Sequence, residues 1–139
     1  MVHLWIVFCR SVLEQSCVVW HSSLTQENID DLERTQKTFS KLVLKENYQN
    51  YENAQLKLNL DSLHSRRQIL CEKFAKSGIK YNKLNDLLPE NEKKHKMVTR
   101  NNDKFAVQFA HTERLKNSSI IAMQNYLNDE ERQRKTSCG

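Results

Sequence analysis

The residues of this chain that could do chemistry are mainly basic. Guanidinium and ammonium groups bind the phosphates of RNA or DNA, and these backbone contacts weaken as the salt concentration rises. A pair of adjacent arginines and a later cluster of basic residues are the candidates for such contacts. The candidate nucleic-acid-binding residues are Arg66, Arg67, Lys93, Lys94, Lys96 and Arg100.

A structural role for the two arginines is the alternative. Arg67 falls on the apolar stripe of a predicted helix, which consists of Leu63, Arg67, Leu70 and Phe74. A buried guanidinium costs several kcal/mol unless it is paired. One of the two arginines is therefore expected to meet a carboxylate of an earlier helix, and Glu14 and Glu33 are the candidate partners.

Other kinds of chemistry are poorly supported by the sequence. Gly78 and Gly139 are the only glycines, so a phosphate-binding glycine loop is excluded. Asp30 and Asp31 are neighbours on a predicted helix and point about 100° apart, which favours helix-terminus electrostatics over metal catalysis. No nucleophile, base and orienting group can be placed together. We expect no catalytic site, no cofactor and no small-molecule substrate in this chain.

The four cysteines follow no metal-binding or disulfide pattern. Zinc sites bring ligands in close pairs, and Cys9, Cys17, Cys71 and Cys138 are not spaced in this way. Cys17 and His21 lie one helical turn apart, but a buried thiol is the simpler interpretation. We expect no metal site and a reducing compartment, cytoplasmic or nuclear, for a protein that is not secreted.

The elements that must position these residues are predicted to be helices. The 139 residues include two Gly and one Pro, too few for a fold built on tight turns. The net charge of +5 is uneven, because residues 1–60 carry six basic and seven acidic groups and residues 61–139 carry sixteen and ten. The basic excess therefore belongs to the second half of the chain.

Three main helices and one short helix are expected in the first part of the chain. The first covers residues 2–20, and the second begins after the capping residue Thr25 and carries Gln36 within its apolar stripe. A short helix follows at residues 51–58. The third main helix begins at Asp61 or Ser62 and ends at Lys76, with Gly78 as its stop.

The apolar first segment does not have the features of a membrane or signal sequence. Its uninterrupted apolar run covers only residues 4–9, far short of the ~20 residues that span a bilayer. It also lacks a basic start and a small-residue cleavage site. We expect no membrane association.

The second part of the chain is predicted to be less regular. A basic linker surrounds Pro89, residues 105–109 alternate as in a strand, and residues 97–99 could pair with them in a short hairpin. A last helix begins at Ser118 or Ser119, and residues 129–139 form a disordered tail. The expected fold is thus mainly α, with a small helical bundle over residues 1–78 and a basic, partly disordered region over residues 79–139.

Several segments together resemble one protein family. They are residues 10–20 (RSVLEQSCVVW), residues 32–37 (LERTQK), residues 51–54 (YENA), residues 58–60 (LNL), Leu63 with Arg66, Arg67, Leu70 and Cys71, and the scattered Arg100, Phe105, Val107, Thr112, Lys116, Ser118, Leu127 and Asn128. In this order and spacing they are similar to the region after the palm of reverse transcriptases from non-LTR, LINE-type (jockey-like) retrotransposons. The resemblance covers roughly residues 4–128.

The resemblance implies a parent activity and restricts what this chain can do. The family carries out RNA-directed DNA synthesis with palm aspartates and divalent metal ions such as Mg²⁺. This sequence has no aromatic-x-Asp-Asp turn, and the family's endonuclease, fingers and cysteine-histidine knuckle have no counterpart in it. We therefore expect a C-terminal fragment that is inactive alone and whose partners are RNA or DNA and the absent polymerase core. The alternative is a non-catalytic helical remnant with a nucleic-acid-binding or structural role.

Overall fold

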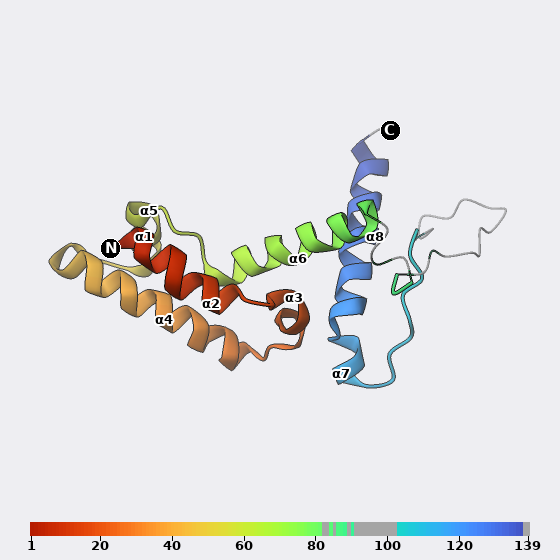
Figure 1. Cartoon of the computed structure of the whole chain (residues 1–139), viewed down its shortest axis with the longest axis horizontal. Coiled ribbons are helices and arrows are strands. Elements are labelled where there is room, and N and C mark those ends of the chain that lie inside the picture. Colours follow the sequence, from red (N-terminus) through yellow and green to blue (C-terminus); the bar gives the residue numbers. More distant parts are fainter. Residues whose placement is uncertain (82–83, 85, 89, 91–102, 138–139) are drawn as a thin grey trace. The chain divides into compact units, whose positions relative to one another are not determined.

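The structure is a computed structural model that describes residues 1–81, 84, 86–88, 90 and 103–137. It is mainly helical, as the sequence predicts (Figure 1). The chain divides into two compact units, Met1–Leu70 and Cys71–Gly139. The division falls inside a helix, whereas the sequence suggested a first region that extends to residue 78.

The first predicted helix is present but is broken near its end. It runs through α1 (Val2–Leu4), a π-helical turn η1 (Trp5–Arg10) and α2 (Ser11–Glu14). Ser16 then adopts a left-handed conformation with φ of 53°, and the chain restarts in α3 (Cys17–Trp20) and the 3₁₀ turn η2 (His21–Ser23). The Trp20 indole donates a hydrogen bond of 3.0 Å to the Gln15 carbonyl, which satisfies an acceptor that the break leaves free.

The second and short helices match their predicted positions. Helix α4 (Gln26–Leu44) is capped by Thr25, whose hydroxyl accepts a hydrogen bond from the Asn28 N–H at 3.4 Å. A 3₁₀ turn, η3 (Lys45–Asn47), leads toward α5 (Tyr51–Leu58), which the side chain of Asn50 caps. Gln36 is fully buried, as its place in the apolar stripe predicts.

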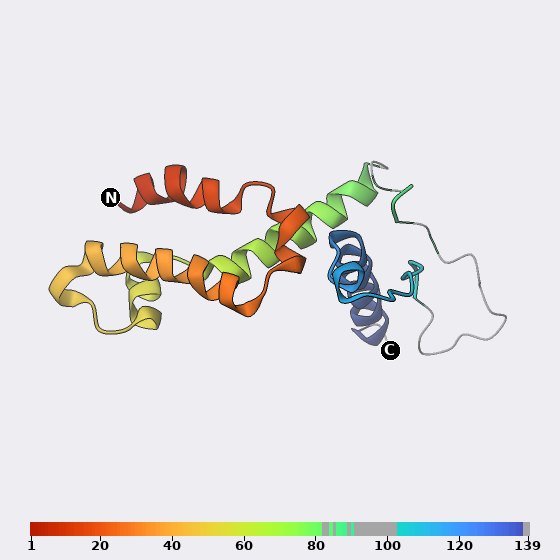
Figure 2. The same cartoon turned by 90° about the horizontal axis from the view of Figure 1, so that it is seen from below.

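The first helical segment packs along α4. Figure 2 shows the two running side by side, and the Trp5 ring stacks on the Phe39 ring with 4.4 Å between centroids. The apolar core of this unit continues through Cys17, Ala54 and Leu63, all of which are buried. Stacked aromatic rings bury a large area for few side chains, which suits a chain with only 38% hydrophobic residues.

Helix α6 (Leu63–Lys80) is longer than predicted, and the role assigned to Gly78 was wrong. Gly78 does not end the helix but lies inside it and is buried. A Cβ atom at this position would overlap the side chain of Leu84. The glycine therefore permits a close approach of the following chain and does not serve as a helix stop.

In the second unit, a side chain replaces the strand pairing that the sequence suggested. Residues 103–112 contain no strand, and the structure records only an isolated antiparallel bridge between Glu90 and Phe105. The Asn128 amide accepts a hydrogen bond from the Phe105 N–H at 3.0 Å and donates one to the Phe105 carbonyl at 3.1 Å. The other predicted arm, residues 97–99, lies outside the described residues.

The last helix begins where expected but continues to Ser137, into the segment predicted to be a disordered tail. After the short α7 (Glu113–Lys116), helix α8 spans Ser119–Ser137. Arg132 forms a bidentate ion pair with Asp103, with N–O distances of 2.9 and 2.8 Å. Arg134 forms an ion pair of 2.8 Å with Glu130, one helical turn earlier. These charge pairs support helix in a segment that composition alone assigns to disorder.

The length and hydropathy of the described helices were compared with those of membrane-spanning helices. No single described helix combines the length and apolar character needed to cross a bilayer. The segments Val2–Glu14 and Cys17–Ser23, which meet at a bend of 42°, satisfy that test of length and composition only when they are taken together.

Candidate nucleic-acid interface

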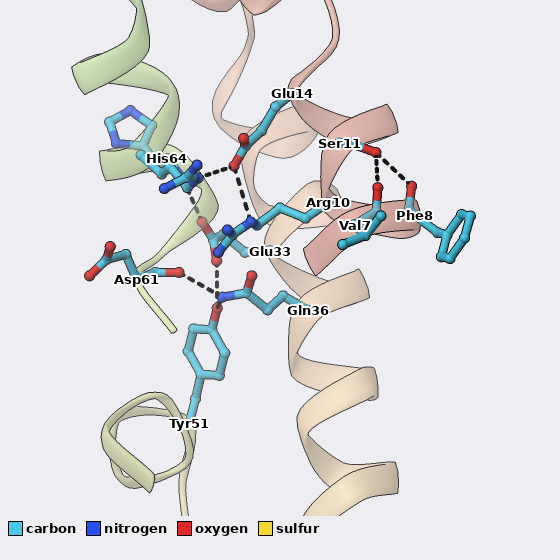
Figure 3. Close-up of polar contacts among 11 residues, drawn as sticks. Val7, Phe8, Arg10, Ser11, Glu14, Glu33, Gln36, Tyr51, Asp61 and His64 are labelled. Carbon is cyan, nitrogen blue, oxygen red and sulfur yellow. Dashed lines mark hydrogen bonds and ion pairs between the residues drawn. The ribbon is translucent and has the colours of Figure 1, made fainter. Parts of the chain in front are cut away.

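Arg66, the first of the two predicted contacts on α6, is engaged within the protein. Its Nε donates to the Glu14 carboxylate at 2.5 Å, and the Nε of Arg10 lies 3.6 Å from the same oxygen (Figure 3). The Glu14 side chain is 12% exposed and that of Arg66 is 34% exposed. Arg66 thus meets Glu14, one of the two acidic partners proposed from the sequence.

Arg67 is fully buried. Its exposed fraction is 0%, and its guanidinium carbon is 5.7 Å from the centre of the Trp20 ring. This cation–π contact offsets part of the cost of burying the charge. A phosphate in solvent cannot reach a side chain in this position, so Arg67 is not available as a backbone contact.

Glu33, the other proposed acidic partner, has a different role. Its carboxylate accepts hydrogen bonds from the Tyr51 hydroxyl at 2.7 Å and from the His64 backbone N–H at 2.8 Å (Figure 3). The second contact places a negative charge at the N-terminus of α6, where it is favourable. The remaining predicted contacts, Lys93, Lys94, Lys96 and Arg100, lie outside the described residues.

A basic surface that the sequence interpretation missed lies on α4. Lys37 and Lys41 are exposed, and each lies close to an aromatic ring: Lys37 Nζ is 5.2 Å from the centre of the Tyr51 ring and Lys41 Nζ is 5.6 Å from that of Tyr48. We call these four residues the lysine–tyrosine face. Lys45 follows one turn later at the end of the helix.

The structure shows no ion pair between these two lysines and the carboxylates of the described residues. Arg34, one turn before Lys37, does pair with Asp31 at 2.8 Å, but both side chains are more than half exposed. Such an exposed ion pair contributes little to the free energy of unfolding, so Arg34 can bind another anion at little cost.

A polar network fixes Tyr51, one of the two tyrosines of this face. The Gln36 amide donates hydrogen bonds to the Tyr51 hydroxyl and the Asp61 carbonyl, both at 2.9 Å, while Tyr51 donates to Glu33 (Figure 3). Burial raises the pKa of Tyr51, and the neighbouring Glu33 raises it further. The hydroxyl therefore stays protonated at neutral pH, and the ring is fixed beneath Lys37.

The sequence did contain a signal for this face. Arg34, Lys37, Lys41 and Lys45 recur at three- and four-residue steps, the spacing of one face of a helix. These four account for most of the six basic residues of the first sixty positions. Residues 1–60 as a whole are slightly acidic, so their net charge does not indicate this cluster of basic residues.

Two histidines, the buried His21 and the partly exposed His64, lie close together near Arg67. The rings of His21 and His64 are 5.2 Å apart, and burial, together with Arg67 and His64, lowers the pKa of His21. Within the part of the chain that the structure describes, no three His, Cys, Asp or Glu side chains come together as metal ligands. The histidine pair thus belongs to the packing of the first unit.

Comparison with protein-family models, with curated proteins and with solved structures gives no match for this chain. The resemblance to LINE-type reverse transcriptases therefore depends on the sequence motifs alone and stays a prediction.

Proposed function

We propose that this chain is a non-catalytic helical module of the kind that follows the palm in LINE-type reverse transcriptases, and that it binds the backbone of RNA or DNA through α4. The ordered motifs over residues 4–128 support the family, and the lysine–tyrosine face supports the binding role. The coding sequence upstream of residue 1 tests the family directly. A frame that encodes an aromatic-x-Asp-Asp turn supports it, and an unrelated untranslated region contradicts it.

The single observation that carries the binding proposal is the pairing of exposed lysines with tyrosine rings. Ammonium groups attract phosphates without regard to base sequence, and the tyrosine ring beneath each ammonium group helps to hold it in place. Lys37 and Lys41 lie one helical turn apart, about 6 Å along the helix. This spacing is similar to that of successive phosphates in an extended single strand, so single-stranded RNA or DNA is the preferred form of the ligand.

The test is the affinity of the whole chain for a fluorescein-labelled, single-stranded RNA of about 20 nucleotides at low salt. The variant Lys37→Gln/Lys41→Gln removes two charges from the face and is expected to bind about ten-fold more weakly. The control variant Lys73→Gln/Lys116→Gln removes the same charge from exposed sites elsewhere and is expected to lose less than about three-fold. Equal losses in the two variants, or no binding by the unaltered chain, would contradict the proposal.

A further inference from the structure

The first helix presents an apolar face that nothing in the described chain covers. Leu4, Val7, Phe8 and Val12 are between 58% and 68% exposed and recur along the continuous helical segment Val2–Glu14. Ser11 lies among them, but its hydroxyl donates to the carbonyls of Val7 and Phe8, so it adds no unsatisfied donor to the face. We call these four apolar residues the apolar ridge.

The charged residues of the same segment point elsewhere. Arg10 and Glu14 are directed toward the polar cluster that includes Arg66, whereas the Phe8 ring points away from it (Figure 3). The apolar ridge is therefore free of charge along its length. Contiguous exposed apolar surface of this kind marks a site of protein association.

Two grooves lie beside the ridge, where the first segment meets α4. One has a volume of about 590 Å³ and is walled by Val12, Leu13, Trp20, Leu24 and Leu32. The other has a volume of about 500 Å³ and is walled by Trp5, Cys9, Phe39 and Leu42. Asp31 contributes to both grooves, so they follow one another along the same helix pair.

We propose that a second copy of this chain covers this surface in a symmetric dimer, with the apolar ridge of each copy seated in the grooves of the other. A two-fold interface needs one surface that is complementary to itself, and a ridge beside grooves of the same apolar character meets that need. The pairing joins two helices from each copy into a four-helix arrangement, in which helices bury apolar stripes against each other.

The size of the exposed surface fits this occupant. The four side chains of the ridge and that of Leu42 are each more than half exposed, and a standard protein interface of ~800 Å² per partner buries apolar side chains of this kind at its centre. The groove margins carry neutral polar side chains such as Gln15, Asn28 and Thr38. An apolar centre with a polar rim is the usual anatomy of a protein–protein contact.

The charges around the grooves disfavour nucleic acid and lipid at this surface. The described wall residues include one cation, Arg34, which pairs with Asp31. A phosphate backbone needs a surplus of cations, and helices that lie on membranes usually carry lysine or arginine along their polar margin. The dimer surface is thus chemically distinct from the lysine–tyrosine face.

The test measures the mass of the whole chain by sedimentation equilibrium between 1 and 100 µM, together with two matched variants. The unaltered chain is expected to reach twice its 16.5 kDa mass. Phe8→Glu places a charge at the centre of the ridge and should weaken dimerisation at least about ten-fold, with unchanged helical circular dichroism. Leu56→Glu, at a residue of α5 that is 80% exposed, should dimerise as the unaltered chain does.

Three results would overturn the dimer. One is a monomer of the unaltered chain at 100 µM, and another is an equal loss of dimer in Phe8→Glu and Leu56→Glu. The third is a monomer that binds phosphatidylcholine vesicles and loses this binding in Phe8→Glu, which would assign the ridge to lipid. None of these outcomes changes the expected RNA affinity, because the lysines of α4 are not part of the ridge.

Discussion

Arg66 on α6 pairs with Glu14 and Arg67 is buried beside Trp20, whereas Lys37 and Lys41 on α4 are exposed and lie beside two tyrosine rings. The four residues carry the same formal charge and differ in what surrounds them. The arginine side chains stabilise packing, and the lysine side chains leave their charge available to an anion. A basic residue can therefore be assigned to a binding surface only after its burial and partners are known.

The largest effect on stability is expected at Arg67. Replacing it with alanine removes a fully buried side chain that packs beneath Trp20, and the resulting cavity should lower the free energy of unfolding by about 3 kcal/mol. Lys37→Ala, at the surface, should change it by less than about 0.5 kcal/mol. Urea unfolding followed by circular dichroism measures both values. If both variants changed the free energy of unfolding by a similar small amount, the proposed difference between the buried Arg67 and the exposed Lys37 would be contradicted.

A smaller loss is expected at the hydroxyl that joins the core to the lysine–tyrosine face. Tyr51→Phe leaves Glu33 and Gln36 without a shared partner, which should cost about 1–2 kcal/mol of unfolding free energy. Tyr48→Phe serves as the matched control, because the structure records no hydrogen bond to its hydroxyl and both variants keep an aromatic ring below a lysine. Equal stability of the two variants in thermal unfolding would show that the network does not support the face.

The smallest expected effect is a pH dependence that arises at His21. Because burial and the nearby Arg67 and His64 lower the pKa of His21, the unfolded chain binds its proton more readily than the folded chain does. Stability should therefore fall as the pH drops below the ordinary histidine value of 6.5. The midpoint of thermal unfolding at pH 5.0 and 7.5 measures this fall, and His21→Gln should reduce it. An undiminished fall in that variant would place the titrating group elsewhere.

Much of the first unit could be predicted from its sequence, because the signals are local. Thr25 before an apolar stripe indicates the start of α4, and the short α5 was placed at its observed bounds. The break at Ser16 could not be predicted, since it depends on a left-handed residue that is not glycine and on a hydrogen bond from Trp20. The prediction of a strand at Phe105 was wrong. The side chain of Asn128, which is distant in sequence, forms hydrogen bonds with both the N–H and the carbonyl of Phe105.

The candidate site was only partly predictable for a related reason. The sequence shows that Arg67 falls on an apolar stripe, and its burial follows from that position. The sequence does not show that the rings of Tyr48 and Tyr51 lie next to Lys41 and Lys37 of α4. That arrangement depends on the turn between α4 and α5 and on the contacts of Gln36, which are properties of the folded chain.

The central claim is that the α4 lysines, and not the α6 arginines, contact the nucleic-acid backbone. The dependence of single-stranded RNA affinity on salt concentration tests it most directly. The slope of log K against log[salt] is negative, and each lost phosphate contact reduces its magnitude by about 0.7. The magnitude should decrease by about 1.4 in Lys37→Gln/Lys41→Gln and remain unchanged in Arg66→Gln. An unchanged slope in the lysine variant, or a reduced slope in the arginine variant, would contradict the claim.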